Sequence, residues 1–394
     1  MLEIMDSINL ARTAQSKNEG DKKDMDESLS YFGSRVDRLI KGTDLTRDEA
    51  HQLFCQILEN EQPDLQQGAF LAAITAKGAT AEEIAGIWQA IYDIDTVKVQ
   101  PDVSGPLTEN CGTGMDGIKT FNISTAASLV SASDGIIMAK HAARAITSKC
   151  GAVDILETLG VDVECNVDLV KRSIEQVGIG IFNGMSPMVH PSALYRILSQ
   201  IRFGTILNVA GSLANPAQPA HAVRGVYSED MVLPIARAMK EIGYKKAFVV
   251  HGKSRDGSRG MDELSTVGRS VVAELAEDGS IREYTLNPHD LGIKQADEKA
   301  LLHNGDLKAE AINLLRLLSG EEPGSRKDII CLNAAAVLCI AGRASSLEEA
   351  MEKASDIIDS ARPIKKLKDW VAHQNSDPGP HLEKLDLMLE AAYN

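Results

Sequence analysis

The chain has 394 residues, of which 44% are hydrophobic and 4% aromatic, and its formal net charge is −15. This length is ample for a sizeable core and is typical of two domains. The acidic charge argues against nucleic acid and membranes as partners, although backbone N–H groups, helix N-termini and metal ions can still hold a phosphorylated ligand. The six cysteines form no C-x-x-C pair, and no apolar run approaches the roughly 18 residues of a membrane span. We therefore expect a cytoplasmic protein with reduced thiols.

The first hundred residues predict an extension followed by helices. Residues 1–30 predict an N-terminal extension, because residues 16–28 are polar and charged without an apolar period, and residues 1–14 could form one short helix. Residues 31–100 predict a helical domain, because Thr46 with Glu49 and Thr80 with Glu83 have the spacing of capping boxes. Helical periodicity follows both boxes, and residues 64–77 predict a further helix between them.

From about residue 101 the pattern changes to alternating strands and helices. Short apolar runs predict strands at 135–139, 178–182, 247–251 and 281–286. Helical periods lie between and after them, at 122–133, 151–159, 229–242, 309–318 and 345–393. This alternation predicts an α/β domain over residues 101–394 with a mostly parallel sheet. Ligands of such sheets gather at the carboxyl ends of the strands.

A glycine-bearing loop leads into one of these helices. It reads C-G-T-G-M-D-G over residues 111–117, and N-I-S-T follows over residues 122–125. Glycines allow close backbone approach to a ligand, and a helix N-terminus presents N–H donors to an anion. A tight turn would explain G-T-G alone, but the loop together with N-I-S-T favours phosphate binding.

Two further features suit a site for a highly anionic substrate. Asp262 and Glu263 follow a predicted strand and a glycine-rich loop, which favours a Mg²⁺ site over the solvated turn that adjacent acids usually form. Lys140 follows the predicted strand at 135–139, so we expect it at a strand end. Cys111 and Cys150 flank these loops, and we expect them to pack rather than to react.

Several motifs, in order along the chain, resemble those of the anthranilate phosphoribosyltransferase family. Besides the glycine loop with N-I-S-T, they are K-H-A-A-R at 140–144, T-S-K-C-G-A-V-D at 147–154, L-E-T-L-G at 156–160, T-I-L-N-V-A-G-S-L-A-N-P-A at 205–217 and G-M-D-E-L-S at 260–265. The resemblance covers roughly residues 31–375. It implies a small helical domain, joined by a helical segment near 190–203, beside a larger α/β domain of the nucleoside phosphorylase and phosphoribosyltransferase type. It also implies an active site between the two domains and a homodimer.

The resemblance implies Mg²⁺-dependent transfer of a phosphoribosyl group from phosphoribosyl pyrophosphate to an aromatic amine, with anthranilate, in tryptophan synthesis, as the first candidate. No covalent nucleophile is implied. The implied donor-binding residues are Gly112, Thr113, Gly114, Asp116, Thr120, Asn122, Ser124, Thr125, Lys140 and Lys149. The implied metal ligands are Ser124, Asp262 and Glu263, and the acceptor-site candidates are His141, His190, Arg196 and Arg202.

The chain departs from the family's pattern in the glycine loop, in the K-H-G-N-R motif and most of all in the acceptor region. Met115 stands where the family usually has Gly, and Ala142 and Ala143 replace Gly and Asn of the family's K-H-G-N-R. Leu198 falls at the position of the arginine that binds the acceptor's carboxylate, so an acceptor other than anthranilate stays open. A nucleoside phosphorylase and a non-catalytic, nucleic-acid-binding relative are further alternatives. The retained acidic pair and the net charge argue against the last of these.

Overall fold

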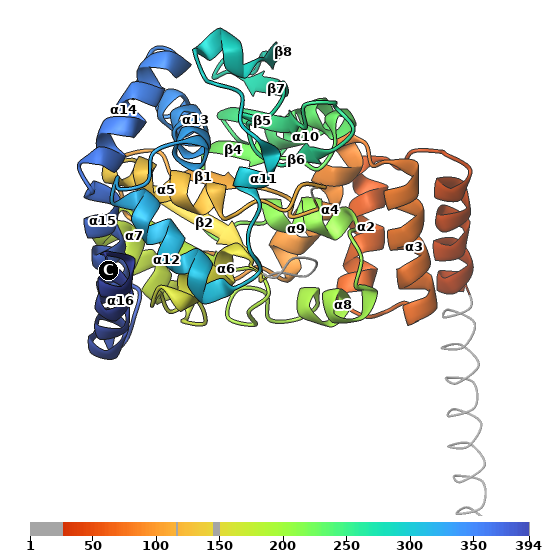
Figure 1. Ribbon diagram of the computed structural model, residues 1–394. Helices are drawn as coiled ribbons and strands as arrows, with labels where there is room; N and C mark the ends of the chain where they lie inside the picture. The colour runs from red at the N-terminus through yellow and green to blue at the C-terminus, as the bar shows by residue number, and fades with distance from the viewer. Residues whose placement is uncertain (1–26, 116, 145–149, 394) are drawn as a thin grey trace, which may run out of the picture.

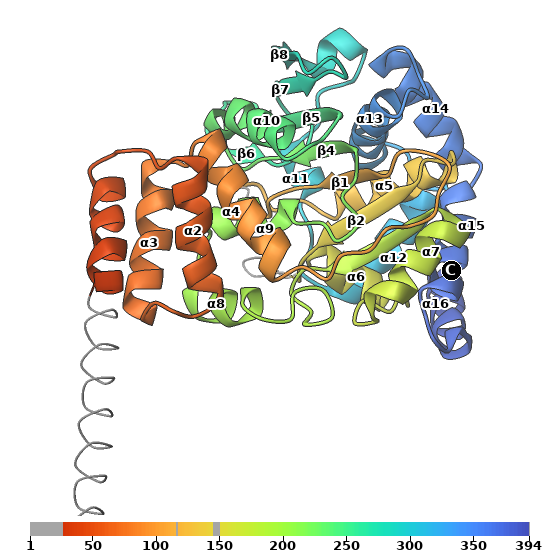
Figure 2. The same cartoon turned by 180° about the vertical axis from the view of Figure 1, so that it is seen from behind.

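The computed structural model describes residues 27–115, 117–144 and 150–393. Most of the predicted extension and two predicted donor-site residues, Asp116 and Lys149, lie outside the described residues. A bundle of helices forms one end of the molecule, and a sheet covered by helices forms the rest (Figures 1 and 2). The predicted fold class, a small helical part followed by a larger α/β part, is therefore confirmed.

The helical part contains a helix over residues 27–40, α2 (Arg47–Leu58), α3 (Asp64–Lys77) and α4 (Ala81–Ile94). Both predicted capping boxes are present: the Thr46 hydroxyl accepts from the Glu49 N–H at 3.2 Å, and the Thr80 hydroxyl accepts from the Glu83 N–H at 3.3 Å. Two helices from later in the chain, α8 (Leu194–Ile201) and α9 (Ile206–Leu213), contribute buried side chains to the same core.

One sheet organises the larger part. Within the described residues it has eight strands in the order β3-β2-β1-β4-β5-β7-β8, with β6 paired to β5. The run from β3 to β5 is parallel, whereas β6, β7 and β8 pair antiparallel. The bounds are β1 (Thr108–Cys111), β2 (Met138–Ala142), β3 (Ile179–Asn183), β4 (His221–Gly225), β5 (Lys246–Lys253), β6 (Gly260–Met261), β7 (Ser270–Leu275) and β8 (Ile281–Leu286).

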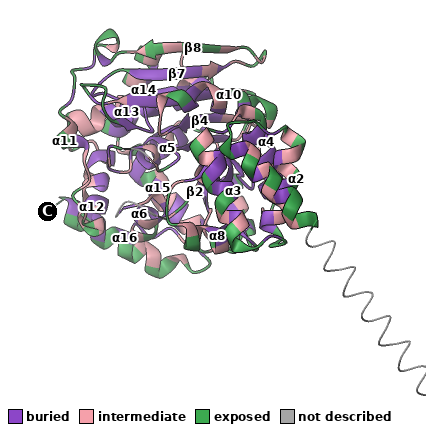
Figure 3. Ribbon diagram, turned by 90° about the vertical axis from the view of Figure 1, so that its right-hand side faces the viewer, coloured by how far each residue is buried: buried purple, intermediate pink, exposed green. Residues whose placement is uncertain are grey.

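Alternation along the strands divides the interior into two large cores. In β5, Ala247 and Val249 pack with the helical part, whereas Phe248 and Val250 pack on the opposite face. Since side chains alternate between the faces of a strand, one central strand supports both cores. Figure 3 shows β4, β7 and the helix α13 (Ser325–Ile340) as largely buried.

Helices cover both faces of the sheet. The core around Ala247 includes α10 (Val232–Glu241), and the core around Phe248 includes α5, α6 and α12 to α16. None of the helices in the described ranges is long and apolar enough to cross a membrane. The remaining bounds are α5 (Ile123–Ser133), α6 (Ala152–Thr158), α7 (Val167–Val177), α11 (Glu298–Leu301), α12 (Leu307–Leu318), α13 (Ser325–Ile340), α14 (Leu347–Asp359), α15 (Arg362–His373) and α16 (Pro378–Tyr393).

The predicted strands at 247–251 and 281–286 are confirmed as β5 and β8, and that at 178–182 as β3 with a shift of one residue. The strand predicted at 135–139 is shifted, because β2 begins at Met138. Lys140 therefore lies inside a strand and not after it, and the expectation of a strand-end lysine was wrong. β1 and β4 were not predicted, because Glu109 and Arg224 interrupt their apolar pattern.

Candidate active site

A cavity of about 500 Å³ lies between the parallel strands and the α8–α9 segment. Its lining comes from the glycine loop, the start of α5, β2, the α8–α9 segment and the acidic pair Asp262 and Glu263. The parallel strands direct their carboxyl ends to this region, as expected for an α/β sheet. Residues from several predicted motifs that lie far apart in the sequence thus share one cavity.

The glycine loop after β1 is fastened to the acidic pair. A Cβ on Gly112 would overlap the Asp262 carboxylate, so glycine is required there for close approach. Gly114 has φ +70° and donates its N–H to the Asp262 Oδ2 atom at 2.7 Å. The Gly117 N–H donates to the Gly260 carbonyl at 3.0 Å, which joins the end of the loop to the same segment. The glycine loop and the segment that carries the acidic pair therefore form one unit.

The acidic pair fits a magnesium ion that is bound together with its substrate. The side chains of Asp262 and Glu263 are largely buried, and both residues line the cavity with Ser124. The described residues contain no group of three or more His, Cys, Asp or Glu that would hold a metal by itself. Mg²⁺ usually takes one or two carboxylates and completes its shell with water and substrate phosphates. The two carboxylates and the Ser124 hydroxyl beside the glycine loop match that set of ligand atoms.

The start of α5 presents some of the predicted donor-binding residues to the cavity and hides another. Thr120, Asn122 and Ser124 line the cavity. The Asn122 side chain makes no capping bond to α5 and instead donates to the Cys150 carbonyl at 3.3 Å. Thr125 is fully buried and does not line the cavity, because its place in the first turn directs it into the core.

Lys140 lines the cavity from within β2 and is almost completely buried. Its Nζ atom donates to the Asn110 carbonyl at 2.7 Å and to the Ser128 hydroxyl at 3.0 Å. Burial lowers the pKa of this ammonium group to about 8. Burial also raises the pKa of the Cys111 thiol, and raises that of Cys150 to about 12, which agrees with packing roles for both cysteines.

The two predicted acceptor-site histidines form a pair, of which His141 lines the cavity. Their Nε2 atoms lie 3.1 Å apart, and both side chains are buried. His190 lies behind His141 and contacts the Asp95 carbonyl through Nδ1 at 2.7 Å. Burial lowers the pKa of both imidazoles, and that of His141 falls well below its usual value. The pair is therefore neutral at physiological pH.

The two predicted acceptor-site arginines do not line the cavity. Arg196 donates to the Gln67 side-chain oxygen at 3.0 Å and to the Ile57 carbonyl at 2.8 Å, so its guanidinium group is held within the helical part. Arg202 is exposed, has φ 48° and donates to a carbonyl of α8. Leu198 lines the cavity between them. The position that carries the family's arginine thus presents an apolar side chain here.

Among the described residues, Arg144 is the one arginine that lines the cavity. Its Nη1 atom lies 3.2 Å from Asp154 and 2.7 Å from Glu157, and its Nη2 atom lies 2.7 Å from Glu164. Glu157 is the largest cause of a raised Arg144 pKa. Three carboxylates therefore fix this guanidinium group and offset its charge.

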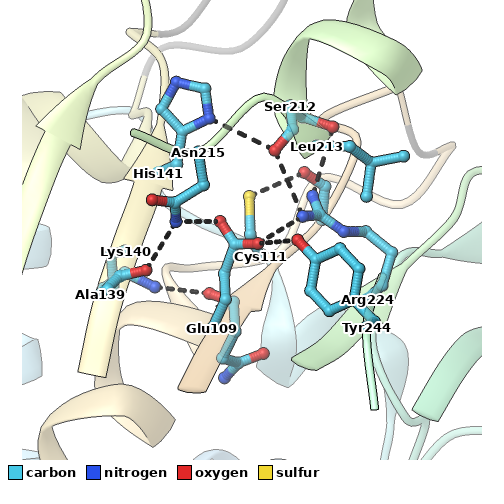
Figure 4. Close-up of polar contacts among 12 residues, drawn as sticks. Glu109, Cys111, Ala139, Lys140, His141, Ser212, Leu213, Asn215, Arg224 and Tyr244 are labelled. Atoms are coloured by element: carbon cyan, nitrogen blue, oxygen red, sulfur yellow. Dashed lines mark hydrogen bonds and ion pairs between the residues drawn. The ribbon is translucent and has the colours of Figure 1, made fainter. Parts of the chain in front are cut away.

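Sequence reasoning missed a buried charged network beneath the cavity (Figure 4). Arg224 donates to Glu109 at 2.7 Å, and the same carboxylate accepts from Tyr244 at 3.2 Å and from Asn215 at 3.1 Å. Arg224 also donates to the hydroxyl of Ser212, which lines the cavity, at 3.2 Å. Burial raises the Glu109 pKa, and the guanidinium group opposes that effect. The sequence signal that could have revealed this network is a charged residue inside each of two neighbouring strands, Glu109 in β1 and Arg224 in β4.

Comparisons with known proteins agree with this geometry. The profile of the glycosyl transferase family, a/b domain, matches residues 104–362, and that of the family's helical bundle domain matches residues 36–93. The chain is 39% identical over 340 residues to an anthranilate phosphoribosyltransferase of Anaeromyxobacter dehalogenans strain 2CP-C, which covers 86% of this chain and 97% of the relative.

Two solved structures extend the comparison. The anthranilate phosphoribosyltransferase of Thermus thermophilus is 32% identical with a TM-score of 0.77, and covers 86% of this chain and 98% of that one. The Saccharomyces cerevisiae enzyme, in complex with PRPP and Mg, shares the fold at 24% identity with a TM-score of 0.76, and covers 88% of this chain and 99% of that one. With these identities, coverages and matching domains, the chain belongs to the anthranilate phosphoribosyltransferase family.

Proposed function

We propose that the protein transfers a phosphoribosyl group from phosphoribosyl pyrophosphate to the amino nitrogen of anthranilate and releases pyrophosphate. The single observation that carries this proposal is the cavity in which the glycine loop and the acidic pair face the apolar α8–α9 wall. One side offers backbone N–H groups and a lysine for the anionic phosphoribosyl pyrophosphate, and carboxylates for its magnesium ion. The other side offers apolar contacts for an aromatic ring. The relatives' names favour anthranilate as the acceptor.

The donor is held by groups with complementary charge. The glycine loop supplies backbone N–H groups, and α5 begins beside it, so phosphate oxygens meet donors and the positive end of a helix dipole. Lys140 adds a buried positive charge that is mostly protonated at neutral pH. The proposed donor-binding residues are Gly112, Thr113, Gly114, Thr120, Asn122, Ser124 and Lys140.

Ser124, Asp262 and Glu263 would hold the magnesium ion. When bound, Mg²⁺ supplies charge neutralisation for the pyrophosphate leaving group. The C–O bond to pyrophosphate breaks, the bond from the amino nitrogen to the anomeric carbon forms, and the nitrogen loses a proton. Holding the two substrates in one cavity orients the amino nitrogen toward the anomeric carbon, and this orientation is absent when both are free in water.

The acceptor ring packs against the apolar wall from α8 to α9. Leu194, Leu198, Phe203 and Leu207 line this side. His141 lines the same cavity as a neutral, buried imidazole, and its Nδ1 atom lies 3.3 Å from the Ser212 carbonyl of α9. An acceptor other than anthranilate, a nucleoside phosphorylase and a non-catalytic relative find no support in the comparisons. The domain division at residues 31–100 and 101–394 and the cytoplasmic location stay predictions.

A homodimer is part of the proposal. Large apolar side chains are exposed on the helical part, at Tyr31, Ile40, Leu65 and Tyr195, and Leu65 is 88% exposed. A second copy of the chain that covered these side chains would remove apolar surface from water, which favours association. Light scattering after size exclusion measures the molar mass, and a monomer at micromolar concentration would contradict this part of the proposal.

The test of the activity mixes the protein with phosphoribosyl pyrophosphate, Mg²⁺ and anthranilate, and follows pyrophosphate release together with loss of anthranilate fluorescence. We expect both signals in wild type and neither in Asp262→Asn/Glu263→Gln. The matched control is Glu352→Gln/Asp356→Asn, which neutralises two exposed acids on α14 and should keep full activity. Wild-type protein without either signal refutes the proposal.

A further inference from the structure

A contact across the cavity joins the glycine loop to the link between α8 and α9. Gly204 lies in that link, and a Cβ at this position would overlap the terminal methyl group of Met115 and lie 3.0 Å from its sulfur. Gly204 is not among the described residues with positive φ, so its backbone does not require glycine. The side chain of Met115 is what leaves no room for a side chain at position 204.

The backbone of the loop places Met115 at this contact without strain. The left-handed turn falls on Gly114, with φ +70°, and Met115 is not among the described non-glycine residues with positive φ. Gly114 is fixed in turn by its 2.7 Å hydrogen bond to Asp262. The bulky side chain that replaces the family's usual glycine is thus anchored next to the metal-binding loop and extends to the acceptor side.

Met115 and the apolar side chains of the α8–α9 segment line the same cavity. Leu198, Phe203 and Leu207 line the cavity together with Met115 and Gly204, and Phe203 is still 50% exposed. A thioether is flexible and polarisable, and it packs favourably against aromatic rings. Leu198, Phe203 and Leu207 form an apolar wall that suits an aromatic ring. Met115 adds a further apolar side chain to this wall from the glycine loop.

We propose that Met115 is a specificity-determining residue for the aromatic acceptor. Its side chain, held against Gly204, forms the wall on which the acceptor ring packs and limits the substituents that the ring can carry. This inference rests on the proposed function and adds to it the residue that sets the width of the acceptor site.

The experiment compares wild type with Met115→Ala, Met115→Leu, Gly204→Ala and the double variant Met115→Ala/Gly204→Ala. Steady-state rates give KM for each substrate and the ratio of kcat/KM for ring-methylated anthranilates over anthranilate. Met115→Ala removes apolar contact with the acceptor ring, so it should raise the anthranilate KM on the order of tenfold. It should also raise the kcat/KM ratio of ring-methylated anthranilates over anthranilate. The KM for phosphoribosyl pyrophosphate should stay within about twofold of wild type. Met115→Leu conserves volume, so its anthranilate KM and acceptor ratio should change less than those of Met115→Ala.

Gly204→Ala tests the contact itself. Its added methyl group should displace the Met115 side chain and raise the anthranilate KM, whereas in the double variant the methyl group has room and the effect should equal that of Met115→Ala alone. Thermal unfolding checks that every variant is folded.

Three outcomes would overturn the inference: an unchanged acceptor ratio in Met115→Ala, a rise in donor KM instead of acceptor KM, or additive effects in the double variant. Wild-type protein that does not turn over anthranilate would refute the proposed function and this inference with it. Wild-type turnover with any of the three outcomes refutes this inference alone.

Discussion

The buried ion pair between Glu109 and Arg224 predicts a large and strongly non-additive loss of stability. Arg224 is 1% exposed and Glu109 is fully buried, so Arg224→Met leaves a carboxylate in the interior with only Tyr244 and Asn215 as neutral donors. Breaking a buried pair on one side costs about 3–5 kcal/mol, because an uncompensated charge stays buried. Removing both charges restores most of that loss. We therefore expect Glu109→Gln/Arg224→Met to be more stable than Arg224→Met.

Urea unfolding of the four proteins in this double-mutant cycle measures the coupling. The chain has two tryptophans, Trp88 in the core of the helical part and Trp370 in the other large core, so fluorescence and circular dichroism together report whether both cores unfold in one transition. The control is Lys41→Met, which breaks an exposed pair with Asp37 and should cost less than about 1 kcal/mol. A cost below about 1 kcal/mol for Arg224→Met, or single effects that simply add, would refute the reasoning.

Three further predictions concern the site. Gly112→Ala should displace the Asp262 carboxylate and lower kcat/KM for the donor about a hundredfold, whereas Gly68→Ala, where a Cβ meets nothing within 4 Å, should leave it unchanged; equal effects would contradict the close-approach argument. The lowered Lys140 pKa, about 8, predicts that kcat/KM for the donor falls as the pH rises through that value, and a flat profile up to about pH 10 would exclude this role. Burial lowers the pKa of His141 and His190, so the unfolded chain takes up protons that the folded chain does not, and stability should fall below about pH 6.5 by at most ~1.4 kcal/mol per pH unit for each histidine. His190→Asn should reduce that slope in urea unfolding, and an unchanged slope would show that other groups cause it.

Much of the fold and part of the site followed from local sequence patterns. The capping boxes at Thr46 and Thr80 begin helices where predicted, because a cap and its helix depend on residues a few positions apart. The alternation of strands and helices predicted the mostly parallel sheet. The glycine loop and the acidic pair were expected in one site, and Gly114 and Asp262 lie within hydrogen-bonding distance.

The orientation of individual side chains could not be predicted in the same way. Arg196 and Arg202 are near cavity-lining residues in the sequence, such as Leu198 and Phe203. The packing of α8 on the helical part nevertheless directs Arg196 toward Gln67, and Arg202 lies in a left-handed turn. Thr125 stands one residue after Ser124, and that step around the helix moves it from the cavity into the core. Because a helix turns by about 100° per residue, a motif of neighbouring residues is divided between faces.

By itself, the sequence determined the change from a helical part to alternating strands and helices, the glycine loop before α5 and the set of groups for an anionic, metal-assisted substrate. These features depend on backbone preferences and chemistry within short segments. Only the tertiary structure decided which distant residues meet. Glu109 and Arg224 are 115 residues apart and Met115 reaches Gly204 across the cleft. Such contacts follow from how two strands pair and how two helical segments pack, and no local periodicity encodes them.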